Sequence, residues 1–135
     1  MNQSVKTVVE ECTRASDEER VAFPQVVMKL MDAGVERYHA DLVRSEKTYY
    51  MPDDASHAVP NASVGSVPAK DFSSTGVEAA VRAIQAGRIR YKEFCERIAM
   101  AGCVGYHVSL AGRRAVYYGR TGDSYVEPFP AAPAP

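Results

Sequence analysis

The sequence predicts an α+β fold, a two-layer sandwich in which one antiparallel sheet carries helices on one face. Apolar residues recur at helical spacing in two successive stretches of each half of the chain. After each pair of stretches the apolar period changes from about 3.6 residues to 2, which is typical of a strand with one buried face. The third observation is a repeat, because AGVERYH at 33–39 returns as AGCVGYH at 101–107.

The repeat extends over most of the chain. Shifting the sequence by 68 residues without a gap aligns 7–60 with 75–128, and fifteen of the 54 pairs are identical. Average residue usage would give about three or four identical pairs. We therefore interpret the chain as a tandem duplication. Because two copies are too few for a solenoid, we expect the halves to close on each other with pseudo-twofold symmetry, like the subunits of an isologous dimer.

The predicted organisation is a single α+β domain at 1–128. A chain of 135 residues can bury a core without disulfides or a structural metal. The domain holds the two repeats, 7–60 and 75–128, joined by a crossing loop at 61–74 that is rich in Ser, Gly, Ala and Pro. The Pro/Ala-rich end, 129–135, is predicted to be a disordered tail.

Each half is predicted to begin with a helix. The patterns TVVE at 7–10 and TGVE at 75–78 match a capping box, in which the Thr and Glu side chains each accept an amide proton of the first turn. The apolar stripes expected on these helices are Val5, Val8, Val9 and Cys12 in the first half and Val77, Ala80, Val81 and Ile84 in the second.

A second helix is predicted to follow in each half. Both copies are expected to stop at an Ala-Gly pair, because Gly34 and Gly102 can take the left-handed conformation that ends a helix at the least cost. The apolar positions are Phe23, Val26, Val27, Leu30 and Met31 in one copy and Tyr91, Phe94, Cys95, Ile98 and Ala99 in the other.

Two strands joined by a hairpin are predicted after each helix pair, so the sheet is expected to have four main strands. Loops at 43–46 and 111–114 reverse the chain. A short third extended piece, 56–59 and then 124–127, is ended by a proline in each half. In the first strand, the apolar residues Tyr38, Ala40 and Leu42 alternate with the polar residues Arg37, His39 and Asp41.

The polar face of the sheet holds the candidate functional residues. A hairpin loop of two or four residues would place His107 opposite Tyr118 and, by the repeat, His39 opposite Tyr50. Three interpretations stay open for this face and for the groove between the repeats: self-association, a small-molecule ligand, or an enzyme that uses His and Tyr as acid-base groups. The candidate site residues are His39, Tyr50, His107, Tyr118, Arg37 and Asp41.

Composition and charge argue against several classes of protein. The net charge is −1, so the basic surplus of a nucleic-acid-binding protein is missing. No window holds eighteen consecutive apolar residues and no signal-peptide pattern opens the chain, so we expect no membrane association and a cytoplasmic location. The three cysteines have no CxxC spacing and the histidines no HxH or HxxxH spacing. We therefore predict no metal site and no cofactor.

Two long segments carry a resemblance to a known family. The strings AGVERYHADLVRSEKTYYMPDD followed by SHAVP, and GCVGYHVSLAGRRAVYYGRTGDSYVEPFP, resemble the DUF1398 family of small bacterial and prophage-encoded proteins. The resemblance spans nearly the whole chain apart from the Pro/Ala tail. It implies a compact α+β fold and a soluble, cytoplasmic protein. The family has no established activity or catalytic residues to carry over, so the three interpretations stay open.

Overall fold

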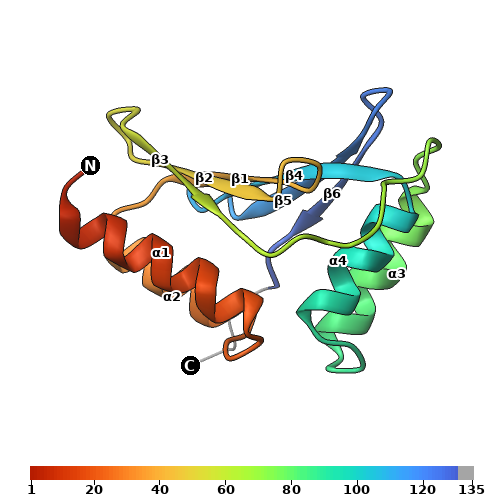
Figure 1. Cartoon of the computed structure of the whole chain (residues 1–135), viewed down its shortest axis with the longest axis horizontal. Helices are drawn as coiled ribbons and strands as arrows, with labels where there is room; N and C mark the ends of the chain where they lie inside the picture. The colour runs from red at the N-terminus through yellow and green to blue at the C-terminus, as the bar shows by residue number, and fades with distance from the viewer. Residues whose placement is uncertain (131–135) are drawn as a thin grey trace.

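The computed structural model describes residues 1–130 and consists of two layers, with four helices packed under one face of a six-stranded antiparallel sheet (Figure 1). The predicted α+β class is confirmed. The end of the predicted tail, 131–135, lies outside the described residues. The helices are α1 (Gln3–Asp17), α2 (Phe23–Asp32), α3 (Ser74–Gln85) and α4 (Tyr91–Met100), and the strands are β1 (Arg37–Asp41), β2 (Glu46–Tyr50), β3 (Ser56–Pro60), β4 (Cys103–Ser109), β5 (Arg114–Gly119) and β6 (Ser124–Pro128).

The first helix of each half begins earlier than its predicted capping box. The Asn2 side chain accepts a hydrogen bond from the Val5 amide at the start of α1, and the Ser73 side chain accepts one from the Gly76 amide at the start of α3. The predicted caps at 7 and 75 are therefore wrong, because polar side chains upstream already satisfy the free amides of the first turn.

The second helix of each half ends where the sequence predicts. Beyond α2, Gly34 has φ of +83°, and beyond α4, Gly102 has φ of +89°. Both backbones lie in the left-handed region that only glycine enters without a Cβ penalty. The chain then turns upward from the helical layer into the sheet.

The sheet has six strands rather than four, in the order β3-β2-β1-β4-β5-β6. The pieces predicted as short extensions, β3 and β6, are full outer strands that pair antiparallel with β2 and β5. The first strands of the two halves, β1 and β4, pair with each other at the centre. One continuous sheet therefore joins the two halves of the chain.

The core lies between the sheet and the helices. Four tyrosines point down from the central strands, and apolar side chains of all four helices meet them. A buried Tyr hydroxyl needs a hydrogen-bond partner. At Tyr49 this partner is the Thr13 hydroxyl, which lies 2.8 Å from the Tyr49 hydroxyl. Each fully buried large apolar side chain contributes about 1.5–3 kcal/mol. The main core residues are Tyr38, Tyr49, Tyr106, Tyr117, Val9, Leu30, Val77 and Ile98.

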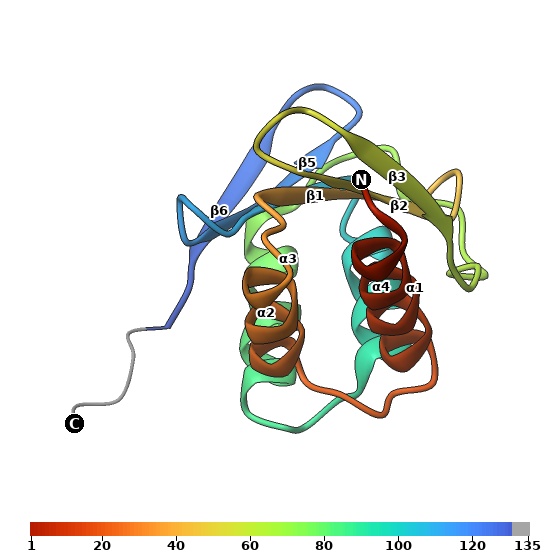
Figure 2. The ribbon, with the colours of Figure 1, turned by 90° about the vertical axis from the view of Figure 1, so that its left-hand side faces the viewer.

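All four helices lie on the same side of the sheet, as the end-on view shows (Figure 2). The opposite face is not covered by any helix of the described residues. No helix in this part of the chain is long and apolar enough to cross a membrane.

Candidate functional site: the open sheet face

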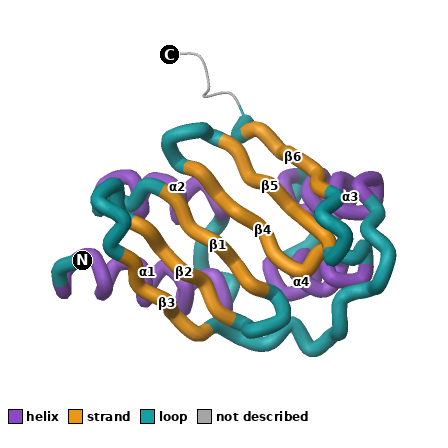
Figure 3. Tube along the Cα trace, turned by 90° about the horizontal axis from the view of Figure 1, so that it is seen from above, coloured by secondary structure: helices purple, strands orange, loops and turns teal. Residues whose placement is uncertain are grey.

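We call the helix-free side of the sheet the open face (Figure 3). Strand register arranges its side chains in three rows that run across all six strands. The basic row holds Ser56, Tyr50, Arg37, Ser109, Arg114 and Pro128; the central row holds Ala58, Thr48, His39, His107, Val116 and Val126; the acidic row holds Pro60, Glu46, Asp41, Gly105, Tyr118 and Ser124.

Two histidines lie side by side in the centre of this face. His39 on β1 and His107 on β4 are direct cross-strand partners. Their ring centroids are 4.5 Å apart and the ring planes make an angle of 42°. His39 is half-buried and His107 is exposed.

The predicted His-Tyr pairing has the right face but the wrong register. His107 lies opposite Val116, and His39 lies opposite Thr48. Both hairpin connections keep four residues but begin one residue earlier than predicted, at 42 and 110. This moves each cross-strand partner by two positions, which leaves every side chain on its expected face.

Tyr118 nevertheless joins the histidine pair from a diagonal position. Its hydroxyl lies 2.6 Å from His39 Nε2, and its ring stacks on that of His107 at a centroid distance of 5.6 Å. Gly105 makes this approach possible. A Cβ atom at Gly105 would lie 2.6 Å from the Tyr118 hydroxyl oxygen and 3.0 Å from its ring carbon Cζ. The central cluster, as we call it, consists of His39, His107 and Tyr118.

Three predicted site residues lie on the open face but outside the central cluster. Tyr50 packs under the Arg37 guanidinium, whose Cζ lies 3.9 Å from the ring centroid. This cation–π contact holds the Tyr50 ring against Arg37 within the basic row. Asp41 accepts hydrogen bonds from the amides of Val43 and Arg44, both at 3.0 Å, so its carboxylate supports the β1–β2 turn.

The surroundings favour uncharged side chains in the central cluster. Burial lowers the pKa of His39, while the nearby carboxylates of Asp41 and Glu46 oppose that shift. Burial also lowers the pKa of His107, and the neighbouring His39 and Arg37 lower it further. The pKa of Tyr118 is raised, chiefly by burial. Both imidazoles are therefore largely neutral at pH 7, and the phenol keeps its proton.

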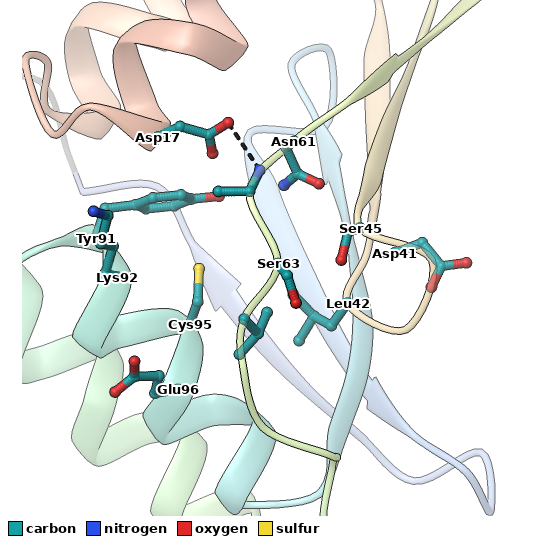
Figure 4. A pocket seen from close by; sticks show the side chains of 12 residues that line it. Asp17, Asp41, Leu42, Ser45, Asn61, Ser63, Tyr91, Lys92, Cys95 and Glu96 are labelled. Atoms are coloured by element: carbon teal, nitrogen blue, oxygen red, sulfur yellow. Dashed lines mark hydrogen bonds between the residues drawn. The ribbon is translucent and has the colours of Figure 1, made fainter.

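Two hollows in the described part of the chain lie where helices meet the sheet, and a few open-face row residues also line them: Asp41 lines the first, and Ala58 and Pro60 line the second. A cavity of about 70 Å³ lies between the end of α1, the β1–β2 hairpin, the linker after β3 and α4 (Figure 4). Asp17 closes one side by accepting a hydrogen bond from the Ala62 amide at 2.9 Å. Burial raises the pKa of the Cys95 thiol in its wall to about 11, so this thiol is a poor nucleophile at neutral pH.

The second hollow is a more open groove of about 420 Å³ beside the outer strand β3. It runs between β3 and α1, and His57 and Glu10 face each other across it with 2.9 Å between Nε2 and Oε1. The third histidine of the chain is therefore separate from the central cluster, on the helix side of the sheet.

Lys47 is a further notable residue, and it is not among the predicted site residues. Its side chain points into the core from β2 with 3% of the residue's surface exposed, and within residues 1–130 no hydrogen bond or ion pair to its ammonium group is found. Its ammonium group lies 4.8 Å from the ring centroid of Tyr91. Burial lowers its pKa. The sequence could have indicated this burial, because Lys47 and Tyr49 are two positions apart in the strand and therefore point to the same, apolar side of the sheet.

Comparison with known proteins places the chain in a family. The model of DUF1398, described as a protein of unknown function, matches residues 6–127. The chain belongs to the DUF1398 family. Similar proteins include an uncharacterized protein of Mycobacterium bovis and two of Mycobacterium tuberculosis, each 37% identical over 68 residues. That match covers 50% of this DUF1398 chain and 40% of each mycobacterial protein.

Proposed function

We propose that this DUF1398 chain is a non-enzymatic interaction domain that associates with a second copy of itself through the open face. The observation that carries the proposal is the arrangement of charge on that face. Arg37 and Arg114 lie in the basic row, and Asp41 and Glu46 lie in the acidic row. The two rows are separated by the central row, in which the histidines are largely neutral.

This arrangement is self-complementary for one orientation of two copies. A twofold axis along the central row, perpendicular to the strands, turns the basic row of one copy over the acidic row of the other. Arg37 then faces the second copy's Asp41 across the gap, and Tyr50 faces the second copy's Glu46. A twofold axis parallel to the strands would instead collect the arginines of both copies at one end. Charge complementarity of this kind selects the orientation of an interface.

The shape of the face also favours a large partner over a small ligand. Small-molecule sites are concave and surround most of the ligand. The two hollows described above lie where helices meet the sheet, and Asp41 is the one candidate site residue that lines either of them. An enzyme that used His39 and Tyr118 would need a site that excludes water, and an open sheet offers no walls for one.

We also propose that the two repeats arose by tandem duplication. Supporting this, α4 and β6 begin and end 68 residues after α2 and β3, the same shift that aligns the sequence repeats. His39 and His107 are equivalent in the repeat and are also direct partners in the sheet. A twofold axis between the halves would therefore pass between these two residues.

The proposed self-association is tested by measuring the mass of the protein in solution. We expect sedimentation equilibrium at pH 7.5 to show a monomer–dimer equilibrium that weakens as salt increases, because salt screens the facing charges. Arg37→Glu places a carboxylate opposite the second copy's Asp41. It should raise the dimer dissociation constant at least about tenfold, which corresponds to about 1.4 kcal/mol.

The matched control is Arg88→Glu, which makes the same charge change at an exposed position between α3 and α4. This variant should dimerise like the wild type. Circular dichroism checks that both variants are folded. A monomer at all concentrations up to about 100 µM would overturn the proposal, as would a dimer that Arg37→Glu leaves unchanged.

A further inference from the structure

We propose that His39 and His107 together bind one divalent transition-metal ion of the class that prefers imidazole nitrogen, such as Zn²⁺, Ni²⁺ or Cu²⁺. The two residues are direct partners on antiparallel strands and project from the same face. Two imidazoles held by neighbouring backbones form a preorganised chelate, because little side-chain freedom is left to lose on binding.

The separation of the rings fits a shared ion. Metal–nitrogen bonds of about 2.0–2.1 Å place the centres of two imidazoles on one ion about 4.5 Å apart at the 90° angle of square-planar Cu²⁺ or Ni²⁺, and about 5.2 Å apart at the tetrahedral angle that Zn²⁺ prefers. The ring centroids of His39 and His107 are 4.5 Å apart. No movement of the strands is needed to bring the rings to this distance.

The charged side chains around the pair are of both signs. The charged groups that face the pair are Arg37, which disfavours a cation, and Asp41 and Glu46, which favour one. The nearest phenol, Tyr118, is protonated and adds no charge.

Tyr118 supplies the outer contact that metal-binding histidines usually have. Its hydroxyl is 2.6 Å from His39 Nε2. This hydrogen bond orients the ring and, when Nε2 carries the proton, leaves Nδ1 free to coordinate. No group of three or more His, Cys, Asp or Glu side chains converges anywhere in residues 1–130. The bound ion therefore keeps positions open for water or for a ligand from outside the chain.

Linear spacing cannot reveal this site, because the two residues are 68 positions apart and meet only through the pairing of β1 with β4. The proposal therefore departs from the absence of a metal site that the histidine spacing predicts. The inference does not depend on the proposed dimer, since both ligands come from one chain. In such a dimer the central row lies on the twofold axis, so each ion would lie between the two copies.

The test is a titration of tag-free protein with ZnCl₂ at pH 7.5, followed by calorimetry and repeated with NiCl₂. His39→Ala and His107→Ala each remove one ligand. Because even an outer contact of a metal site is worth about 10–100-fold in affinity, either change should weaken binding at least about tenfold. The matched control is His57→Ala, which removes the remaining histidine and should leave binding unchanged.

Binding should also weaken as the pH falls from 7.5 to 5.5, because protons compete for the imidazoles. His107→Gln, which keeps a polar side chain of similar size, provides a second variant in case His107→Ala is poorly folded. The inference is overturned if neither metal binds at millimolar concentration, or if loss of His57 removes binding while loss of His39 does not. A monomer that binds Zn²⁺ through the pair would refute the proposed self-association and leave this inference standing.

Discussion

Gly105 determines which His-Tyr contact forms on the open face. The corresponding position in the first half holds Arg37, whose guanidinium lies over Tyr50 and keeps that ring away from the histidines. At Gly105 no side chain intervenes, so Tyr118 crosses β4 and reaches His39. The difference between Arg37 and Gly105 therefore fits the asymmetry of the central cluster.

Gly105→Ala is expected to displace Tyr118 from the central cluster. The new Cβ would lie 2.6 Å from the Tyr118 hydroxyl oxygen and 2.9 Å from the Ala40 carbonyl oxygen. Overpacking of this kind costs about 1–3 kcal/mol. With Tyr118 displaced, His39 is less buried and its pKa should rise toward the usual value.

Urea denaturation measures the loss of stability, and an NMR titration of the His39 ring measures its pKa. Tyr118→Phe is the companion variant, since it removes the hydrogen bond to His39 without adding an atom at Gly105. If Gly105→Ala changes neither the stability nor the His39 pKa, then the missing side chain is not what admits Tyr118.

Among the elements, the two helix–strand junctions differ although both use glycine. The linker before α3 runs across the second junction, where the Ser73 amide donates to the Ala101 carbonyl at 2.7 Å and the Ala69 amide donates to the Ala99 carbonyl at 2.9 Å. Within residues 1–130 no comparable segment crosses the first junction, where the nearest atom to a Cβ at Gly34 would be Met51 Cε at 3.6 Å.

We expect Gly102→Ala to destabilise the protein more than Gly34→Ala. Both substitutions force a side chain into the left-handed region, at a cost of about 1–2 kcal/mol. At Gly102 the added Cβ would also lie 2.7 Å from the Asp71 carbonyl carbon and 2.8 Å from Phe72 Cα. Backbone cannot move aside as a flexible side chain can, so the second cost adds to the first. Thermal and urea unfolding of the two variants compare them directly, and equal losses would contradict this account of the linker.

For the whole molecule, stability is expected to fall as the pH drops below about 6.5. His39 and His107 have lowered pKa values in the folded state, and the unfolded chain has the usual value of about 6.5. Above that pH both states are uncharged at these positions, so the full stability is present. As the pH falls through the folded pKa values, the unfolded state binds more protons and stability is lost.

The loss is at most about 1.4 kcal/mol per pH unit for each histidine. Urea denaturation between pH 7.5 and 5 measures this loss of unfolding free energy. The range lies above the pH at which most carboxylates titrate, so they contribute little to it. The His39→Gln/His107→Gln double variant should show a flatter dependence over that range. An unchanged slope in the double variant would show that other groups control stability there.

Much of this architecture is predictable because it depends on local rules. The apolar periods located all four helices and the central strands, and Gly34 and Gly102 located the ends of α2 and α4. Starts of helices were less predictable, since any of several polar residues near an N-terminus can accept the free amides, and Asn2 and Ser73 lie upstream of the predicted caps. The predicted register of the two hairpins was wrong for a similar reason. A four-residue connection can begin at either of two neighbouring positions, and the sequence does not distinguish them.

By itself, the sequence determined the α+β class, the faces of the strands, the helix stops and the family, because each depends on spacing along the chain. The tertiary structure alone decided that β1 pairs with β4, and therefore that His39 lies against His107. It also decided that Tyr118 rather than Tyr50 joins them and that the Lys47 side chain is buried in the core. Those outcomes depend on which strands become neighbours and on the space left beside each side chain, and linear spacing contains neither.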